Sequence, residues 1–300
     1  MKRGSRRSVI AGAVLLAAAL GPGAVAGQEG GPQVGPERGA LVIVGGAMRS
    51  PEIYRRFIEL AGGPDAPLVM IPTAGGGEEY DDFYQGLNSW RANGAHNLTV
   101  LHTNDPAEAD TEEFVQPLLD AAGVYFFGGR QWRLVDAYGG TRTEREIRAV
   151  LDRGGVIGGS SAGATIQGSY LVRGDTRTNT VMMGDHTEGF GYLRNVAIDQ
   201  HVLRRNRHFD LIEVIETHPH LLGIGVDENT ALVVRGDAAE VIGESYVLVY
   251  DNRTTTGPSG EFYFLAPGDR FNLATREATR PARTERPLDN LSRRPWGRSR

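Results

Sequence analysis

Short apolar runs alternate with longer mixed segments through the middle of the chain. The apolar runs predict strands at 40–44, 67–71, 97–101, 124–127 and 156–157. These runs show no polar alternation, so each strand is expected to be buried on both faces, as in a parallel sheet covered by helices. The pattern therefore predicts an α/β fold with a doubly wound, mainly parallel sheet.

Helix signals lie between the predicted strands. Ser50 and Pro51 predict the start of the first helix, because serine is a common N-cap and proline fits the first helical position. Thr143 and Glu146 have the spacing of a capping box and predict a helix that ends at Gly154. Two further helices are predicted at 78–93 and 112–121.

The pattern changes after residue 221. Strand-like runs at 223–226, 231–235 and 241–250 are joined by short turns instead of helices. Short turns can join antiparallel strands, whereas parallel strands need a long crossover connection. The region 221–251 is therefore predicted to be an antiparallel extension of the sheet.

Both ends of the chain differ from the body. Basic residues, an apolar run from Val9 to Leu20 and the small residues 24–26 have the order of a secretory signal peptide, with cleavage after Ala26. The apolar run is shorter than a membrane span, so no stable span is expected after cleavage. The other predicted divisions are a flexible linker at 27–38, a single α/β domain at 39–275 and a mobile tail rich in arginine and proline at 276–300.

The predicted signal peptide implies export to the periplasm or the extracellular space. The general secretory route and the twin-arginine route both remain open, because Arg6 and Arg7 form a loose twin-arginine motif.

Composition narrows the chemistry. The 300 residues include no cysteine and carry a formal net charge of −5. The lack of cysteine excludes disulfides, zinc–thiolate sites, iron–sulfur clusters and a cysteine nucleophile. There is no general basic excess of the kind that nucleic-acid binding needs, so no nucleic-acid partner is expected. No metal and no cofactor is expected, and the sequence leaves monomer and homodimer as alternatives.

The fifth predicted strand leads into a turn of the form G-x-S-x-G. Gly159 and Gly163 flank Ser161, and these small residues allow a sharp strand-to-helix turn that exposes the serine oxygen. Such a turn also occurs as a simple connection, so the pentapeptide alone leaves a nucleophile and a structural turn as alternatives.

A nucleophilic serine needs a base, and the base needs an acceptor that orients it. Seven histidines are present. His201 is predicted to enter a helix, and His208 falls on the same face of that helix, so spacing alone does not separate them. Asp227 and Glu228 follow a predicted strand and offer adjacent carboxylates, which could equally serve a turn.

Four ordered motifs together resemble the cyanophycinase and dipeptidase E family of serine peptidases. The motifs are 159–164, the Asp-Gln-His of 199–201 with Arg-Asn-Arg at 205–207, the Thr-His-Pro of 217–219, and 223–231. With the segments 44–46, 71–74 and 126–131, the likeness spans about residues 40–251. The resemblance implies a fold like the class I glutamine amidotransferases, which is flavodoxin-like, with serine in place of cysteine.

The resemblance also implies roles for individual residues. Ser161 would be the nucleophile, His201 the base and Glu228 the acceptor that orients the imidazole, with Asp227 as the fallback. The expected oxyanion-hole residues are Gly128, Gly129 and Ala162. The expected substrate-binding residues are Gln131, Asp199, Gln200, Arg205 and Arg207.

The charged residues among the expected substrate-binding residues indicate which substrate groups they would contact. The two arginines could pair with substrate carboxylates, and Asp199 could read a cationic or amino group.

The resemblance implies a serine peptidase that hydrolyses aspartyl peptide bonds, and the predicted signal peptide implies that this peptidase is exported. The favoured substrate is the β-linked aspartyl-arginine unit of the polymer cyanophycin, and the alternatives are an α-aspartyl dipeptidase and an isoaspartyl peptide hydrolase. A peptide-binding protein without activity is a further alternative. An esterase of the α/β-hydrolase type is disfavoured, because its acid precedes its histidine whereas Glu228 follows His201 here.

Overall fold

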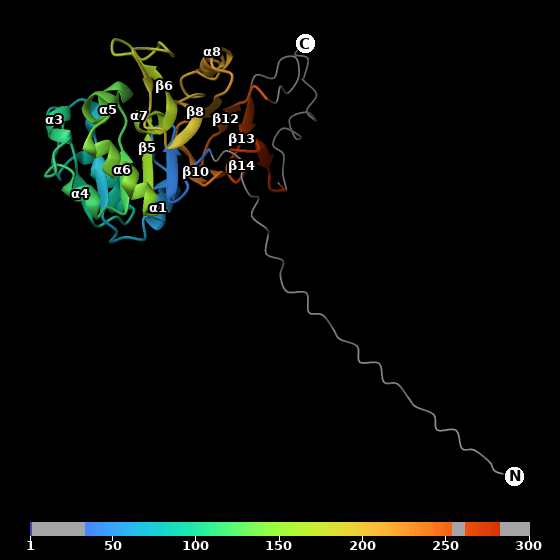
Figure 1. Cartoon of the computed structure of the whole chain (residues 1–300), viewed down its shortest axis with the longest axis horizontal. Coiled ribbons are helices and arrows are strands. Elements are labelled where there is room, and N and C mark those ends of the chain that lie inside the picture. The colour runs from blue at the N-terminus through green and yellow to red at the C-terminus, as the bar shows by residue number, and fades with distance from the viewer. Residues whose placement is uncertain (2–33, 254–261, 283–300) are drawn as a thin grey trace, which may run out of the picture. The chain divides into compact units, whose positions relative to one another are not determined.

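The computed structural model describes Met1 and residues 34–253 and 262–282 (Figure 1). The predicted signal peptide beyond Met1, residues 27–33 of the linker and residues 283–300 of the tail lie outside the described residues, and export stays a prediction. No helix among the described residues is long and apolar enough to cross a membrane.

The larger of two sheets in the described chain has nine strands in the order β15-β14-β11-β10-β1-β5-β4-β2-β3. The five neighbouring strands β1, β5, β4, β2 and β3 pair in parallel. On the other side of β1, the strands β10, β11, β14 and β15 extend the sheet in antiparallel pairing. The predicted α/β fold with its antiparallel extension is therefore confirmed. The bounds are β1 Ala40–Val44, β2 Leu68–Ile71, β3 Leu98–Val100, β4 Gly123–Phe126, β5 Val156–Ser160, β10 Thr230–Arg235, β11 Ala238–Gly243, β14 Arg270–Asn272 and β15 Glu277–Thr279.

Strand β1 shows why the apolar runs lack alternation. Val42 and Val44 pack into a core with Phe57 and Trp90 on one face of the sheet, whereas Ile43 packs into a second core on the other face. Every residue of β1 is buried, so both faces select apolar side chains. The helices are α1 Pro51–Leu60, α2 Asn88–Ala92, α3 Pro106–Ala109, α4 Gln116–Leu119, α5 Gln131–Tyr138, α6 Arg142–Asp152, α7 Ala162–Thr165 and α8 Asp210–Thr217.

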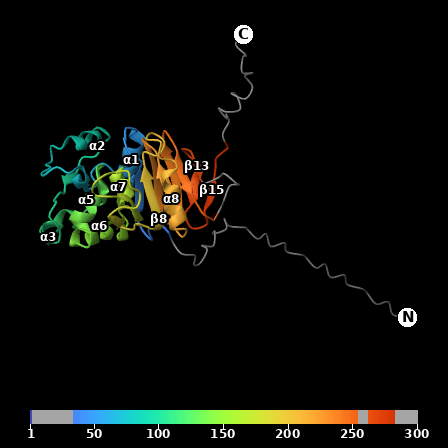
Figure 2. The same cartoon turned by 90° about the horizontal axis from the view of Figure 1, so that it is seen from above.

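A second, six-stranded sheet has the order β13-β12-β9-β8-β6-β7. One face shares the core of the first sheet, and α8 packs on the other face with residues such as Leu211 and Val214 (Figure 2). The sequence did not predict β6, β7 or β8, because charged residues such as Arg173 and Asp199 interrupt their apolar pattern. The bounds are β6 Gly168–Gly174, β7 His186–Glu188, β8 Leu193–Gln200, β9 Leu222–Val226, β12 Val247–Tyr250 and β13 Tyr263–Leu265.

Several predicted elements have different bounds in the structure. The helix predicted at 78–93 is reduced to a short 3-10 turn and α2, and the helix predicted at 112–121 is only the single turn of α4. The predicted strand at 241–250 divides between the two sheets, because the backbone N–H of Glu244 donates to Asn229 and turns the chain.

The predicted capping box at Thr143 is also wrong. Thr141 occupies the N-cap of α6, and the carboxylate of Glu144 accepts a hydrogen bond from the backbone N–H of Gly140. Thr143 is buried instead and donates to the carbonyl of Ala109.

Residues of the predicted linker and of the predicted tail take part in the fold. The backbone N–H groups of Val34 and Gly35 donate to Oδ1 of Asp237 at 2.7 and 3.0 Å, so residues 34–35 are anchored. The predicted mobile tail begins inside the hairpin of β14 and β15, which pair in antiparallel register. The domain therefore includes residues on both sides of 39–275.

Candidate active site

Ser161 lies between β5 and α7 in a conformation that a serine rarely adopts. Its φ is 58° and its ψ is −113°, and its backbone N–H donates to Val44 at 3.0 Å. The flanking glycines allow this turn, because a Cβ on Gly163 would lie 2.2 Å from the carbonyl oxygen of Phe126 and a Cβ on Gly159 would lie 2.3 Å from Gly163. A strained residue at a strand-to-helix turn presents its side chain away from the sheet, as a nucleophile requires.

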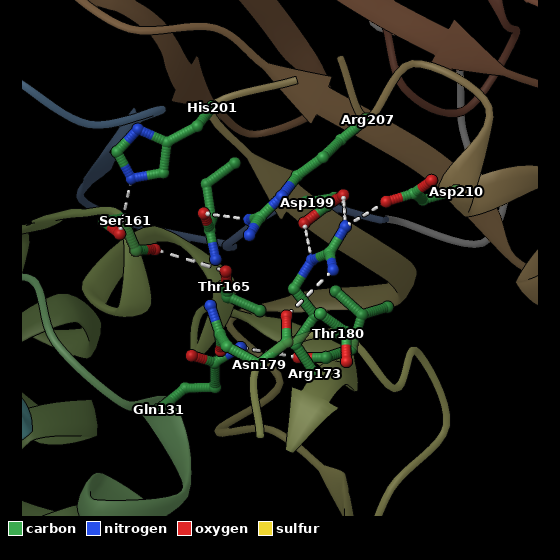
Figure 3. Close-up of polar contacts among 12 residues, drawn as sticks. Gln131, Ser161, Thr165, Arg173, Asn179, Thr180, Asp199, His201, Arg207 and Asp210 are labelled. Atoms are coloured by element: carbon green, nitrogen blue, oxygen red, sulfur yellow. Dashed lines mark hydrogen bonds and ion pairs between the residues drawn. The ribbon is translucent and has the colours of Figure 1, made fainter. Parts of the chain in front are cut away.

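His201 follows β8 directly, and the two sheets bring it to Ser161. Its Nε2 lies 2.9 Å from Oγ of Ser161 (Figure 3). Its backbone N–H donates to Gly45 at 3.0 Å, and its φ of 56° turns the chain out of the strand. Gly46 leaves room for the imidazole, because a Cβ at Gly46 would lie 2.1 Å from Cε1 of His201.

The predicted helix beginning at His201 is wrong. Residues 202–209 form turns, and α8 begins only at Asp210. Asn206 ends this turn, because its φ of 55° is left-handed and cannot continue an α-helix, and Oδ1 of Asp227 accepts the backbone N–H groups of Leu203 and Arg204 at 3.1 and 2.9 Å. His208 consequently does not share a helix face with His201, and its carbonyl accepts a hydrogen bond from Tyr250.

Glu228 supplies the carboxylate that contacts the imidazole. Its Oε1 lies 2.7 Å from Nδ1 of His201. An ionised carboxylate can only accept, so Nδ1 carries the proton and Nε2 is left to accept the hydroxyl proton of Ser161. The guanidinium groups of Arg49 and Arg204 each lie 4.0 Å from the other carboxylate oxygen of Glu228.

Asp227, the fallback for this position, is occupied elsewhere. In addition to its two backbone bonds, it accepts a hydrogen bond from the hydroxyl of Ser245 at 2.6 Å. It shapes the turn after His201 and does not contact the imidazole.

Burial lowers the pKa of His201 below its ordinary value of 6.5. The hydrogen bond to Glu228 acts in the opposite direction and raises this pKa, while the charges of Arg205 and Arg207 lower it. The neutral imidazole, which can accept a proton, is therefore the dominant form at neutral pH.

The expected oxyanion donors gather beside Ser161. Gly128 follows β4, and a Cβ built on it would lie 3.2 Å from Cβ of Ser161. Gly129 has a φ of 152° and packs against the carbonyl of Ala74. Ala162 is the first residue of α7, where a backbone N–H has no partner inside the helix.

Asp199 does not offer a free carboxylate to a ligand. Its two oxygens accept from Nε and Nη2 of Arg173 at 2.8 and 2.9 Å, and Arg173 also binds Asp210 at 2.5 Å (Figure 3). Asp199 and Arg173 are both almost fully buried. The expectation that Asp199 reads a cationic group is therefore corrected, because an arginine of the chain itself satisfies it.

The other expected substrate residues occupy varied environments. Gln200 is buried, and its side-chain oxygen accepts from Arg207 at 3.2 Å. Arg207 is half-buried, and Arg205 is exposed, with its charge acting on the imidazole. Gln131 is fully buried and donates from Nε2 to the carbonyl of Val172 at 2.8 Å.

Three residues that support the site were not predicted from the sequence. Gly46 gives the imidazole space, Arg173 neutralises Asp199, and Asn229 ties the loops together. Oδ1 of Asn229 accepts the backbone N–H groups of Arg49 and Ser50, both at 2.7 Å. The glycine doublet after the first strand was a usable signal for Gly46, but nothing in the local sequence pairs Arg173 with Asp199.

A separate cavity of about 960 Å³ lies at the ends of β2 and β3. Tyr80, Tyr84 and several acidic residues line it, and none of Ser161, His201 or Glu228 does. It is distinct from the hydrogen-bonded serine, histidine and glutamate.

Comparisons with known proteins show the family to which the chain belongs. The model of peptidase family S51 matches residues 41–242. A cyanophycinase from Geminocystis herdmanii is 29% identical over 266 residues, and the alignment covers 80% of this chain and 96% of that protein. A cyanophycinase from a Nostoc species is 29% identical over 264 residues, and the alignment covers 79% of this chain and 86% of that protein.

Solved structures give the same result at the level of the fold. A peptidase from an acI-B1 actinobacterium is similar with a TM-score of 0.60 and 26% identity, over 80% of this chain and 97% of that chain. A putative peptidase E from Listeria monocytogenes, at 19% identity and a TM-score of 0.50, covers 69% of this chain and 99% of its own and shows a likeness of fold. Since the family model matches more than half of the chain, this protein belongs to peptidase family S51 and is a cyanophycinase-like serine peptidase.

Proposed function

We propose that Ser161, His201 and Glu228 act as a catalytic triad that hydrolyses aspartyl peptide bonds. The continuous chain of hydrogen bonds from Oγ of Ser161 through the imidazole to Glu228 carries this proposal. A serine hydroxyl is a weak nucleophile by itself, and a neutral imidazole held in the correct tautomer can remove its proton during attack.

The reaction has two stages. In the first, Oγ of Ser161 attacks the scissile carbonyl while Nε2 of His201 takes the hydroxyl proton and then gives it to the leaving amine. The backbone N–H groups of Ala162 and the 128–129 loop stabilise the negative oxygen. In the second stage, His201 removes a proton from water, and the resulting attack releases the acyl group and restores the serine.

The proposed substrate carries a carboxylate beside the scissile bond. Arg207 is the half-buried cation next to Gln200 and makes no ion pair within the described residues, so it can pair with a substrate carboxylate. The cyanophycinase names of the relatives favour β-linked aspartyl-arginine units, with α-aspartyl and isoaspartyl peptides as alternatives. We also propose that the protein is exported and acts on peptides or polymer outside the cytoplasm.

Product analysis tests this function. Purified protein is incubated with cyanophycin, with β-aspartyl-arginine oligomers and with matched α-aspartyl peptides, and the products are identified by mass spectrometry. Release of β-aspartyl-arginine is expected. Cleavage of the α-aspartyl peptides alone would move the protein to the dipeptidase alternative, and inertness toward all of them would contradict the aspartyl substrate class.

The pH dependence of kcat/KM follows from the lowered pKa of His201. Protonation removes the base, so activity should fall at acid pH with an inflection below 6.5 and should be constant from about pH 7 to 8. Arg205→Gln removes a cation that lowers this pKa and should move the inflection to higher pH. Arg55→Gln, an exposed change on α1, serves as the control. A wild-type inflection above 6.5, or an unchanged inflection in Arg205→Gln, would oppose this assignment.

A further inference from the structure

The segment 175–185 between β6 and β7 is a packed loop beside the serine. Asp175 accepts the backbone N–H and the hydroxyl of Thr178, and Asp185 does the same for Thr176. The backbone N–H of Arg173 donates to the carbonyl of Met182, which fixes the far side of the loop. These contacts give the middle of the loop a defined position.

Arg173 fixes that position relative to the active site. Its Nη1 donates to the backbone carbonyl of Asn179 at 3.0 Å, while its other guanidinium nitrogens bind Asp199. Because Asp199 lies two residues before His201, the loop and the catalytic histidine share one buried ionic anchor. In Figure 3, Asn179 and Gln131 lie on the side of Ser161 away from the imidazole.

Two amide oxygens on this side of the serine have no hydrogen-bond partner in the described chain. Oδ1 of Asn179 and Oε1 of Gln131 are both buried from solvent. Gln131 is held in place, because its Nε2 donates to the carbonyl of Val172, the residue next to Arg173. Buried polar atoms in native proteins are almost always bonded, so each of these oxygens is expected to accept from a donor that the described residues do not supply.

We infer that Asn179 is a further substrate-binding residue, and that its amide oxygen acts with that of Gln131 to accept hydrogen bonds from a nitrogen group of the substrate. The group must offer at least two N–H donors, which an α-ammonium group or a guanidinium does. Asp199 cannot take this role because Arg173 already satisfies it. This inference rests on the proposed peptidase function and specifies which part of the substrate Asn179 and Gln131 contact.

Arg207 and the two amide oxygens suit different groups of the substrate. Arg207 is a cation and suits a substrate carboxylate, whereas the two amide oxygens can only accept. An aspartyl-arginine unit carries both kinds of group, since it has a free carboxylate and nitrogen donors. These residues would therefore hold the unit by contacts of opposite kind, with Arg207 binding the carboxylate and the two amide oxygens accepting from the nitrogen group.

The test compares Asn179→Ala with the isosteric Asn179→Asp, which keeps an acceptor oxygen. The control is Thr180→Ala, an exposed change on the same loop. Four β-aspartyl oligomers are used, which have a free or acetylated amino terminus and either arginine or norleucine side chains. Asn179→Ala should raise KM by about 10-fold, the effect of losing one good hydrogen bond, only for oligomers that keep the recognised nitrogen group. We expect kcat to change less than about 3-fold, since the bond is made in substrate binding.

The pattern across the four oligomers identifies the nitrogen group. If the KM increase in Asn179→Ala disappears when the amino terminus is acetylated, the recognised group is the α-ammonium group. If the KM increase disappears when arginine is replaced by norleucine, the recognised group is the guanidinium. Asn179→Asp and Thr180→Ala should keep the wild-type preference. An equal KM increase for all four oligomers in Asn179→Ala, or no increase for any, would overturn the inference.

Calorimetric binding makes the result independent of turnover. The same oligomers are titrated into Ser161→Ala protein with and without Asn179→Ala. Selective loss of affinity for the nitrogen-bearing oligomers supports the role of Asn179 even if the wild type cleaves none of them, in which case only the proposed activity fails. Equal affinities in the two proteins, or no binding of any oligomer, would refute the role itself.

Discussion

Ser161→Ala is expected to reduce kcat/KM on an aspartyl peptide substrate by about 10⁶-fold, because it removes the hydroxyl oxygen that is positioned to attack with help from His201. Assays of the wild type and the variant at matched concentration, with the acyl-enzyme followed by mass spectrometry, measure this loss. The alanine variant is also the control preparation for product analysis, since contaminating peptidases would remain active in it.

The fold should survive this change. The Ser161→Ala variant would lose one hydrogen bond and no buried apolar contact, so the free energy of unfolding should change by about 1 kcal/mol or less. Thermal unfolding and circular dichroism check this expectation. Retention of more than about 1% of the wild-type activity by a folded Ser161→Ala variant would rule out Ser161 as the nucleophile.

Glu228→Gln is expected to lower kcat by about 10²–10⁴-fold with little change in KM. The glutamine is nearly isosteric, but it lacks the negative charge that stabilises the protonated imidazole, and its amide can turn a donor toward Nδ1 and favour the wrong tautomer. Loss of Glu228 also removes an interaction that raises the pKa of His201, so the inflection of residual activity should move to lower pH. Steady-state kinetics across the pH range measure both effects.

Asp227→Asn is the matched control for this experiment. Asp227 accepts two hydrogen bonds from the turn after His201 and one from Ser245 and does not contact the imidazole, so its amide variant should lose stability more than activity. A decrease in the melting temperature with kcat within about 10-fold of the wild type is expected, as for loss of charge-assisted hydrogen bonds away from the reacting atoms. The reverse pattern, a large fall in kcat for Asp227→Asn and none for Glu228→Gln, would assign the third role to Asp227.

The parallel strands of the first sheet could be predicted because they are defined by local composition. The run 40–44 is buried on both faces, and this requirement alone selects a continuous apolar sequence. In the second sheet, β9 and β12 fall within predicted runs, but β6, β7 and β8 escaped prediction. β6 and β8 bury Arg173 and Asp199, and these residues are tolerated inside only because they pair with each other across 26 positions of sequence.

Helix boundaries failed where the tertiary structure sets the backbone conformation. The segment after His201 forms only turns, because Asn206 has a left-handed φ of 55° that an α-helix cannot continue. The capping-box spacing at Thr143 was also misleading, because the hydroxyl of Thr143 is buried and donates to the carbonyl of Ala109 in the neighbouring helix α3. At Thr143 a tertiary hydrogen bond prevailed over a local preference, which amounts to only a few tenths of a kcal/mol per residue.

The sequence by itself determined the family, the α/β class and the identity of Ser161, His201 and Glu228 as candidates, because these depend on short motifs and on the burial of local runs. Only the tertiary structure decided which histidine and which of two adjacent carboxylates complete the hydrogen-bonded chain, and it showed that Asp199 is already paired with Arg173. The physical reason is that hydrogen bonds and ion pairs act over about 3 Å, and residues 40 or 27 positions apart reach that distance only through the packing of two sheets.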